Sequence, residues 1–299
     1  MAAKPNIGFI GVGYMGHGMA KNIVEKGYAL TVLGHRNRGP VDDLLKRGAS
    51  EAKTASELAG KSDIVFICVT GSPQIEAIVR GPDGLKAGAR KCMIVADCST
   101  ADPTSTLALA AELAPMGVHF IDAPLGGTPA QAEAGKLATM IGAPADVFES
   151  VKPVCEAWAA KVDHIGKVGD GHKMKLINNF LSMGYGALYA EALTLAQKTG
   201  LSPQAYDSVL RGSRMDCGFY QTYMQYVLKR DRDAHKFTIA NAAKDMRYLA
   251  ALADAEGVAN PVGSAVKNAY AAALAAGKGA DFVPMLSDFV AAANGTKLA

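Results

Sequence analysis

The feature that most constrains the fold is a glycine-rich turn near the N-terminus. A short apolar run, Asn6–Ile10, precedes Gly11-Val12-Gly13-Tyr14-Met15-Gly16, and a segment with helical character continues to Lys26. Between a strand and a helix, G-x-G-x-x-G binds a dinucleotide pyrophosphate, because the glycines allow a tight turn and close backbone approach, and the helix N-terminus attracts phosphate. We therefore expect a cofactor site at Gly11, Gly13, Tyr14, Met15 and Gly16; a glycine-rich turn without a ligand is the alternative.

The segment after the second predicted strand, Ala29–Leu33, bears on the choice of cofactor. It reads Gly34-His35-Arg36-Asn37-Arg38. A free ribose 2′-hydroxyl usually meets Asp or Glu near this point, whereas the planar fork of an arginine suits a 2′-phosphate. The segment holds two arginines and no carboxylate, so it predicts that His35, Arg36, Asn37 and Arg38 bind NADP. NAD binding, with the arginines in a solvated loop, is the alternative.

Strand-like and helical segments alternate through the first half of the chain. Further strands are predicted at Ile64–Val69, Cys92–Ala96, Val118–Ile121, Ala138–Ile141 and Asp163–Ile165. Repeated strand–helix units predict an α/β Rossmann domain, a doubly wound parallel sheet that binds ligands beyond the carboxyl ends of its strands. Val69, Thr70, Ser99 and Thr100 lie at such ends, where they can meet cofactor or substrate, or can be ordinary turn and capping residues.

A second glycine-containing loop follows the strand at 118–121. The sequence DAPLGGTPAQAEAGKL begins at Asp122 and places Gly126, Gly127 and Thr128 in succession. Exposed backbone N–H groups and a hydroxyl in such a loop can form a nest for an anion. We expect Gly126, Gly127 and Thr128 to bind a substrate carboxylate; an ordinary loop is the alternative.

A long helix is predicted between Gly169 and Gly200. Apolar residues recur at helical spacing and predict a buried face, formed by Met174, Ile177, Leu181, Leu188 and Leu195. Near its start, Lys175, Asn178 and Asn179 share one face, because residues three and four apart are neighbours on a helix. These polar residues either carry chemistry or are solvated and cap nearby backbone.

The second half of the chain reads as helices only. Ser202-Pro203 and Asn260-Pro261 indicate the starts of two helices. Two further helices are predicted over 238–256 and 282–293. Within the longest of these lie Lys244 and Asp245, which by default form an exposed pair of adjacent charges. The sequence therefore predicts a Rossmann domain over 1–166 and an all-α domain over 167–299 that begins with the long interdomain helix.

The composition bears on whether the protein binds nucleic acid, a membrane or a metal ion. The formal net charge of +3 and the scattered basic residues indicate no nucleic-acid partner, and no apolar run approaches the ~20 residues of a membrane span. The N-terminus lacks the apolar region of a signal peptide. The five cysteines contain no C-x-x-C pair, which indicates neither a disulfide framework nor a zinc or other metal site. Cys68 and Cys92 are expected in the core, and a cytoplasmic location is expected.

Taken together, the motifs resemble those of the β-hydroxyacid dehydrogenase family. They are FIGVGYMGHGMA, DCSTADP, DAPLGGTPAQAEAGKL, GDGHKMKLINN and AAKDM, in this order along essentially the whole chain. The resemblance implies a hydride transfer between a nicotinamide and a small β-hydroxy acid or semialdehyde. It implies Lys175 as general acid/base with Asn179 beside it, Lys244 near the nicotinamide, and Thr100, Asn178 and the Gly126–Thr128 loop near the substrate. It also implies a homodimer or homotetramer.

A lysine can exchange a proton at neutral pH only if its pKa falls well below the usual ~10.4. Burial between domains disfavours the charged form and so acts in that direction. We therefore expect Lys175 to lie in a partly desolvated position.

The sequence departs from the family pattern in the substrate loop. Family members commonly read D-A-P-V-S-G-G, whereas Gly126 occupies the serine position here. The sulfolactaldehyde reductase branch has an arginine where this chain has Gly127, so a cation for a sulfonate is missing. The expected substrates remain of the 3-hydroxyisobutyrate, tartronate semialdehyde (glyoxylate) or succinate semialdehyde type.

Two other classes of protein are alternatives on this fold. Imine reductases tend to carry Asp or Tyr at the position of Lys175, and a non-catalytic NADP-binding scaffold is expected to have lost this lysine. The lysine is present, which favours the dehydrogenase.

Overall fold

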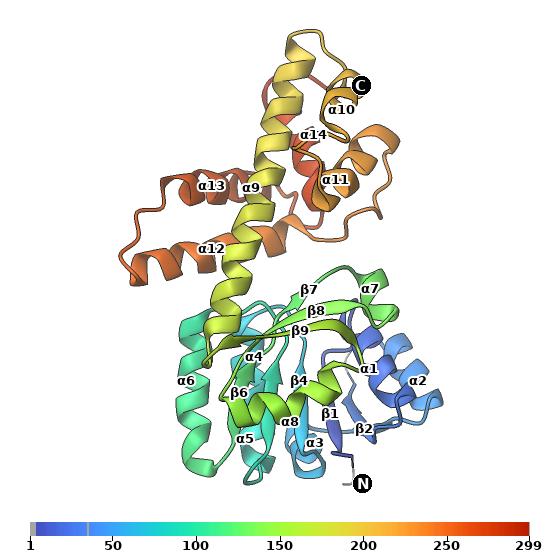
Figure 1. Ribbon diagram of the computed structural model, residues 1–299, viewed down its shortest axis with the longest axis vertical. Coiled ribbons are helices and arrows are strands. Elements are labelled where there is room, and N and C mark those ends of the chain that lie inside the picture. The colour runs from blue at the N-terminus through green and yellow to red at the C-terminus, as the bar shows by residue number, and fades with distance from the viewer. Residues whose placement is uncertain (1–3, 35, 299) are drawn as a thin grey trace. The chain divides into compact units, whose positions relative to one another are not determined.

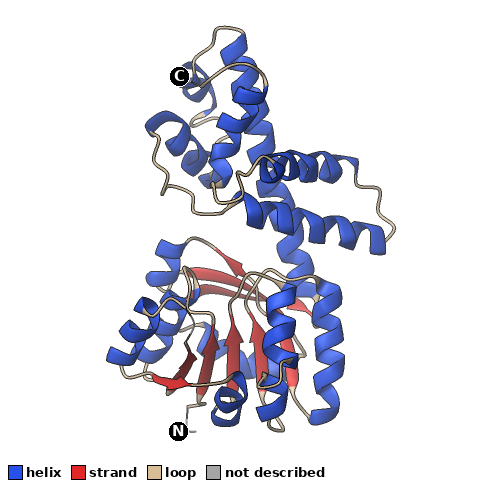
Figure 2. Cartoon of the chain, turned by 180° about the vertical axis from the view of Figure 1, so that it is seen from behind, coloured by secondary structure: helices blue, strands red, loops and turns tan. Residues whose placement is uncertain are grey.

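The computed structural model describes residues 4–34 and 36–298, and the chain divides into two compact units, Met1–Lys175 and Leu176–Ala299. The helix α9 (Asp170–Lys198) runs through the point of division. Figure 2 shows strands in the first unit and helices in the second. The predicted Rossmann domain followed by a helical domain, with a long helix at the junction, is confirmed (Figure 1).

The first unit is built on one sheet, in which nine strands are described. Their order is β3-β2-β1-β4-β5-β6-β8-β7, and β9 pairs with β8. Their bounds are β1 Ile7–Ile10, β2 Leu30–Leu33, β3 Ser50–Ala52, β4 Ile64–Ile67, β5 Ile94–Asp97, β6 His119–Asp122, β7 Leu125–Gly126, β8 Leu137–Gly142 and β9 Ala159–Gly166.

The sequence predicts a parallel sheet, but one part of the observed sheet is antiparallel. Strands β3 to β6 of this order are parallel, but β8 runs antiparallel to β6 and β7. The physical reason is the short connection: only α7 (Pro129–Glu133) separates β7 from β8, and a parallel crossover needs a dozen or more residues.

Helices cover both faces of the sheet. One face packs against α1 (Gly16–Glu25), α2 (Gly39–Lys46) and α8 (Ala145–Cys155). The other packs against α3 (Ala55–Lys61), α4 (Ser72–Arg80), α5 (Leu85–Gly88) and α6 (Pro103–Leu113), which the 3₁₀ turn η1 (Ala114–Met116) follows. The helix α6 begins at Pro103 because the side chain of Asp102 caps it and Pro103 occupies its first position.

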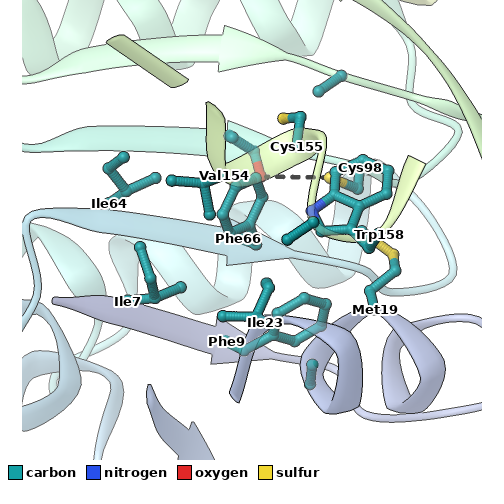
Figure 3. Close-up of a cluster of buried hydrophobic side chains, with 14 of the residues drawn as sticks. Ile7, Phe9, Met19, Ile23, Ile64, Phe66, Cys98, Val154, Cys155 and Trp158 are labelled. Carbon is teal, nitrogen blue, oxygen red and sulfur yellow. Dashed lines mark hydrogen bonds between the residues drawn. The ribbon is translucent and has the colours of Figure 1, made fainter. Parts of the chain in front are cut away.

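The core beneath the glycine-rich turn is large and aromatic (Figure 3). Phe9 of β1 and Phe66 of β4 stack with ring centroids 6.1 Å apart, and Trp158 meets Phe66 edge-on at 6.1 Å. Met19 and Ile23 of α1 are fully buried in the same cluster. Each such side chain contributes about 1.5–3 kcal/mol by leaving water. This packing fixes α1 against β1 and therefore fixes the turn between them.

Cys68 and Cys92 were both predicted to lie in the core, and the prediction is wrong for Cys92. It is exposed and has a left-handed backbone (φ 68°) in the turn before β5, while Cys68 is half-buried. The apolar run Cys92–Ala96 begins before the strand does, so its first residue lies outside the sheet.

The named secondary-structure elements among the described residues of the second unit are all helices. Its elements are the rest of α9, α10 (Pro203–Leu210), α11 (Gly218–Lys229), α12 (Ile239–Ala255), α13 (Pro261–Ala275), η2 (Val283–Met285) and α14 (Leu286–Ala293). Ser202, Thr238 and Asn260 cap α10, α12 and α13, which confirms the predicted starts. The sequence missed α11, whose cap is the sulfur of Cys217. Among the helices of the described residues, none has both the length and the apolar character that a membrane span requires.

The predicted buried face of α9 is wrong. Met174, Ile177, Leu181, Leu188 and Leu195 are 41–66% exposed. The helix instead buries an opposite stripe in the second unit, formed by Leu176, Met183, Ala187, Ala190 and Leu193. Apolar residues line both sides of α9, and periodicity alone does not tell which side a core covers.

Candidate functional site

The glycine-rich turn has the backbone that a pyrophosphate site requires. Gly11 has φ +96°, and a Cβ there would lie 2.1 Å from the carbonyl oxygen of Cys68. A Cβ on Gly16 would lie 2.0 Å from the carbonyl oxygen of Gly11, whereas one on Gly13 would meet nothing within 4 Å. The first and third glycines are therefore needed by the fold. The second faces open space at the start of α1, and Tyr14 beside it is exposed, so the turn fits a phosphate-bearing cofactor.

The strand register brings the other predicted cofactor residues to the same edge. Ile10 pairs with Leu33 and Ile67, Ile67 pairs with Asp97, and Asp97 pairs with Asp122. The loops that follow these carboxyl ends therefore meet at one edge of the sheet, beside the glycine-rich turn. They carry Arg36–Arg38, Val69 and Thr70, and Ser99 and Thr100. The backbone N–H of Val69 donates to the hydroxyl of Ser99 at 3.0 Å, which ties two of these loops together.

The two arginines after β2 differ in their surroundings. Arg38 donates to both oxygens of Glu51, at 2.5 and 3.0 Å, and to Asp42 at 3.0 Å. The hydrogen bonds to Glu51 raise the pKa of the Arg38 guanidinium further above its ordinary value. Arg36 and Asn37 are exposed, and His35 lies outside the described residues.

Sequence reasoning missed the carboxylate of Glu51. It comes from β3, which pairs with β2 so that Glu51 lies opposite Val32. A Cβ on Gly34 would lie 2.1 Å from a Glu51 oxygen, so the absence of a side chain at Gly34 makes room for the ion pair. The pairing of two strands distant in sequence, rather than any local pattern, places this carboxylate beside the loop.

A cavity of about 570 Å³ adjoins the glycine-rich turn. Its lining includes Gly13, Tyr14, His17, Asn37, Pro129 and Glu133. His17 joins three helices here, because Nδ1 lies 2.7 Å from Glu133 of α7 and Nε2 lies 3.0 Å from Asp43 of α2. The glycine-rich turn and the segment after the Gly126–Thr128 loop are therefore held together within the first unit.

The predicted substrate loop is held by strand pairing and by a helix cap. Gly126 pairs with Ala138 of β8, and Gly127 has φ +126°. Thr128 caps α7 in a capping box with Gln131: its N–H donates to Oε1 of Gln131 at 2.9 Å, and its hydroxyl accepts from the Gln131 N–H at 3.3 Å. The sequence T-P-A-Q carries the capping-box signal. Both polar groups of Thr128 are therefore used within the loop.

The second unit holds a buried polar pair that the sequence predicted only in part. Asn179, 5% exposed, donates through Nδ2 to Oδ2 of Asp245 at 2.6 Å, and Asp245 is fully buried. Nζ of Lys244 lies 3.1 Å from Oδ1 of Asp245 and 5.3 Å from the ring centroid of Tyr248. The default expectation of an exposed charge pair is wrong for Asp245. The signal was available, because Asp245 falls on the apolar face of α12 formed by buried residues three and four positions away.

Lys175 is half-buried near the start of α9, and Asn178, on the same helix, is exposed. Helical spacing places Asn178 and Asn179 one turn beyond Lys175. The predicted catalytic residues therefore share one continuous helix.

Comparisons with known proteins agree along the chain. A family model described as the NAD binding domain of 6-phosphogluconate dehydrogenase matches residues 6–166. A second, described as the NAD-binding domain of NADP-dependent 3-hydroxyisobutyrate dehydrogenase, matches residues 169–288.

Individual relatives are similar over most of their length. A 2-(hydroxymethyl)glutarate dehydrogenase of Eubacterium barkeri is 33% identical over 70% of this chain and 69% of its own. A 2-hydroxy-3-oxopropionate reductase of Escherichia coli K12 is 33% identical over 80% and 81%. The crystal structure of a 3-hydroxyisobutyrate dehydrogenase from Salmonella typhimurium superposes with a TM-score of 0.85, at 26% identity, over 95% of this chain and 99% of that one.

Proposed function

This chain belongs to the β-hydroxyacid dehydrogenase family, and from that premise we propose that it is an NADP-preferring 3-hydroxyacid dehydrogenase or semialdehyde reductase. The substrate is a small carboxylate of the 3-hydroxyisobutyrate, tartronate semialdehyde (glyoxylate) or succinate semialdehyde type. The observation that carries the proposal is that Lys175 shares a helix with Asn179, whose amide is fixed by the buried Asp245.

In the proposed mechanism, Lys175 exchanges a proton at Nζ with the reacting oxygen of the substrate. The nicotinamide, when bound, supplies or takes up the hydride. Asn179 holds the same substrate oxygen. Its amide donates one hydrogen to Asp245, so its orientation is fixed while its second hydrogen and its oxygen stay available for substrate and Lys175. In this proposal Lys244 and Thr100 would help to hold the nicotinamide, and Asn178 and Thr100 would help to hold the substrate.

We propose that the substrate carboxylate binds the backbone of Gly126 and Gly127, with Thr128 shaping the loop rather than supplying its main donors. The capping box supports this division of roles, because it uses the N–H and hydroxyl of Thr128. A side chain at position 127 would be strained at φ +126° and would approach Leu137 to 2.8 Å. The loop is thus suited to a carboxylate held by backbone, without a guanidinium at this position.

We propose that NADP is preferred because Arg36 binds the 2′-phosphate. Arg36 is exposed beside the carboxyl end of β2, whereas the guanidinium of Arg38 is held by two carboxylates. The cofactor site then comprises the Gly11–Gly16 turn, the loop with Arg36 and Asn37, Val69 and Thr70. In this proposal the cofactor domain spans 1–166 and the helical domain 167–299.

The exposed apolar stripe of α9 supports a homo-oligomer. Leu181, Leu188 and Leu195 repeat every seven residues and are 56–66% exposed, and Ile177 extends the stripe. Seven-residue spacing is that of a helix–helix seam, and a second copy of the chain offers the same stripe. Leu181→Glu/Leu188→Glu is therefore expected to lower the mass measured by light scattering to that of one chain, whereas Val258→Glu, also at an exposed apolar residue, leaves it unchanged. A monomeric wild type contradicts this part of the proposal.

The activity is tested with glyoxylate, tartronate semialdehyde and succinate semialdehyde, each with NADPH and with NADH. We expect oxidation of NADPH with at least one of them and a lower kcat/KM with NADH. NADPH binding without turnover on any of the three contradicts the proposal and favours a non-catalytic NADP-binding protein. Turnover of cyclic imines alone favours an imine reductase.

A further inference from the structure

A group of buried polar side chains underlies the first turn of α9, and the proposed reaction does not use it. Asp97 ends β5, Asp122 ends β6 and His172 belongs to α9; each is at most 1% exposed. Burying carboxylates and an imidazole costs free energy unless they are paired and hydrogen-bonded. All three lie within the first unit, on the elements that carry the predicted site residues.

Asp122 holds the start of α9. Its Oδ1 accepts the N–H of Gly169 and its Oδ2 the N–H of His172, both at 2.7 Å. A carboxylate in this position satisfies two backbone donors and faces the positive end of the helix. Burial raises the pKa of Asp122 to about 7, while these two N–H groups act to lower it. Contact is close, because a Cβ on Gly171 would lie 2.8 Å from Asp122 and 2.3 Å from the carbonyl oxygen of Met140.

The ring of His172 joins α9 to two further segments. Its Nε2 lies 3.2 Å from the carbonyl oxygen of Ser99, which precedes Thr100, and its Nδ1 lies 2.8 Å from the hydroxyl of Thr106 in α6. A carbonyl oxygen only accepts, so Nε2 carries a proton. The Thr106 hydroxyl also lies 3.2 Å from the carbonyl of Asp102; when it donates there, Nδ1 donates to Thr106.

Two carboxylates lie close to the ring of His172. Nε2 lies 3.7 Å from Oδ2 of Asp97, and Nδ1 lies 4.0 Å from Oδ2 of Asp122. Through these contacts and those to Thr106 and Ser99, His172 is a clamp between α9, α6 and the Ser99–Thr100 loop.

We propose that His172 is a positioning residue for Lys175. This inference rests on the proposed function, because it concerns the residue that exchanges the proton there. Lys175 lies one turn after His172, so the position of its Nζ follows from how the first turn of α9 is held. The same ring fixes the carbonyl before Thr100. Loss of the clamp changes the geometry between the proton donor and the Thr100 loop, and leaves the glycine-rich turn on β1 and α1 intact.

The test compares His172→Gln with His164→Gln. His164 is an exposed histidine of the same unit and serves as the control. Its Nε2 also lies near a carbonyl oxygen, that of Ala143 at 2.8 Å, and its ring stacks on Phe148 at 4.4 Å. We expect His172→Gln to lower kcat roughly 10- to 100-fold, as small displacements of reacting groups do, with NADPH affinity unchanged. Hydrogen exchange at the start of α9 increases in the same variant. His164→Gln changes neither quantity.

A milder variant covers the case in which His172→Gln does not fold. Thr106→Val removes the hydroxyl that contacts Nδ1 of His172 and the carbonyl of Asp102, and it is expected to lower kcat. Thr194→Val is the control: it removes the hydroxyl of a buried threonine of the second unit, which contacts the carbonyl of Ala190, and it leaves kcat unchanged. Normal kcat in both clamp variants overturns the inference.

A double-mutant cycle separates positioning from general destabilisation. If His172 acts through Lys175, His172→Gln causes no further loss of single-turnover rate on a Lys175→Ala background. An equal loss on both backgrounds overturns the inference. Wild-type turnover in Lys175→Ala alone instead refutes the proposed function, while the hydrogen-exchange result still reports whether His172 holds the helix.

Discussion

The pair Arg36 and Arg38 offers a sharp prediction about cofactor choice. Both residues follow β2 and both are exposed, but the guanidinium of Arg38 is held by Glu51 and Asp42 through three hydrogen bonds of 2.5–3.0 Å. A hydrogen bond to a charged group contributes about 1.5–3 kcal/mol, which corresponds to roughly 10- to 150-fold in affinity. We expect Arg36→Ala to weaken NADPH binding by a factor in this range and to leave NADH binding unchanged.

Arg38→Ala is the matched control for Arg36→Ala. Glu51→Gln is a third variant, which removes the charge that holds Arg38. Removing Arg38 deletes a surface ion pair and is expected to change the NADPH dissociation constant by less than about threefold. Glu51→Gln releases the guanidinium of Arg38 beside the same loop, so NADPH binding is expected to tighten.

The assay is fluorescence titration with NADPH and NADH in parallel for wild type and the three variants. A larger loss in Arg38→Ala than in Arg36→Ala refutes the reasoning, because it shows that the Glu51 pair does not withhold Arg38. An equal loss for both cofactors in Arg36→Ala does so as well, because the 2′-phosphate is then not what Arg36 binds.

Three further predictions concern the substrate loop and the helical unit. Asp245→Asn weakens a charge-assisted hydrogen bond to Asn179, which contributes about 1.5–3 kcal/mol; urea unfolding is expected to show a loss of this order with a fall in kcat, and an unchanged kcat argues against a role for Asn179. Thr128→Val breaks the capping box with Gln131, which costs about 1 kcal/mol of stability, and is expected to raise KM for the carboxylate substrate at constant kcat. Thr128→Ser should restore the stability and the KM of the wild type. A normal KM in the valine variant is the opposing result. Burial lowers the pKa of His235 from 6.5 to about 4. Between these two pH values the unfolded chain binds a proton that the folded chain does not. The free energy of unfolding is therefore unaffected by His235 above pH 6.5 and falls by up to about 3 kcal/mol as the pH approaches 4. His235→Phe flattens that fall in urea unfolding at pH 7 and 4.5, and an unchanged slope contradicts the assignment.

The Rossmann half was predictable because its signals are local. The turn at Gly11–Gly16 and the strands β1, β2 and β4 each depend on a few neighbouring residues, and the structure has them close to the predicted bounds. The short strands β3 and β7 were not predicted. The short connection through α7, which makes β8 antiparallel, was not read from the apolar pattern. Where a strand begins was also ambiguous, as the exposed Cys92 shows.

The features of the site that sequence reasoning missed depend on contacts between distant segments. Glu51 meets Arg38 only because β3 pairs with β2, and Asp245 is buried only because α12 lies against α9 within the second unit. The His172 cluster draws residues from β5, β6, α6 and α9. On α9, two apolar stripes compete, and only packing determines which is covered.

The central claim is that Lys175 exchanges the proton in a reaction with NADPH. The most direct measurement compares Lys175→Ala with Lys173→Ala, a lysine two positions earlier on α9 whose Nζ lies 3.8 Å from Asp170. General acid–base catalysis contributes roughly 10²- to 10⁴-fold, so Lys175→Ala is expected to lose turnover by at least that factor while NADPH binds as in the wild type. Lys173→Ala should retain turnover. Turnover of Lys175→Ala close to wild type contradicts the account.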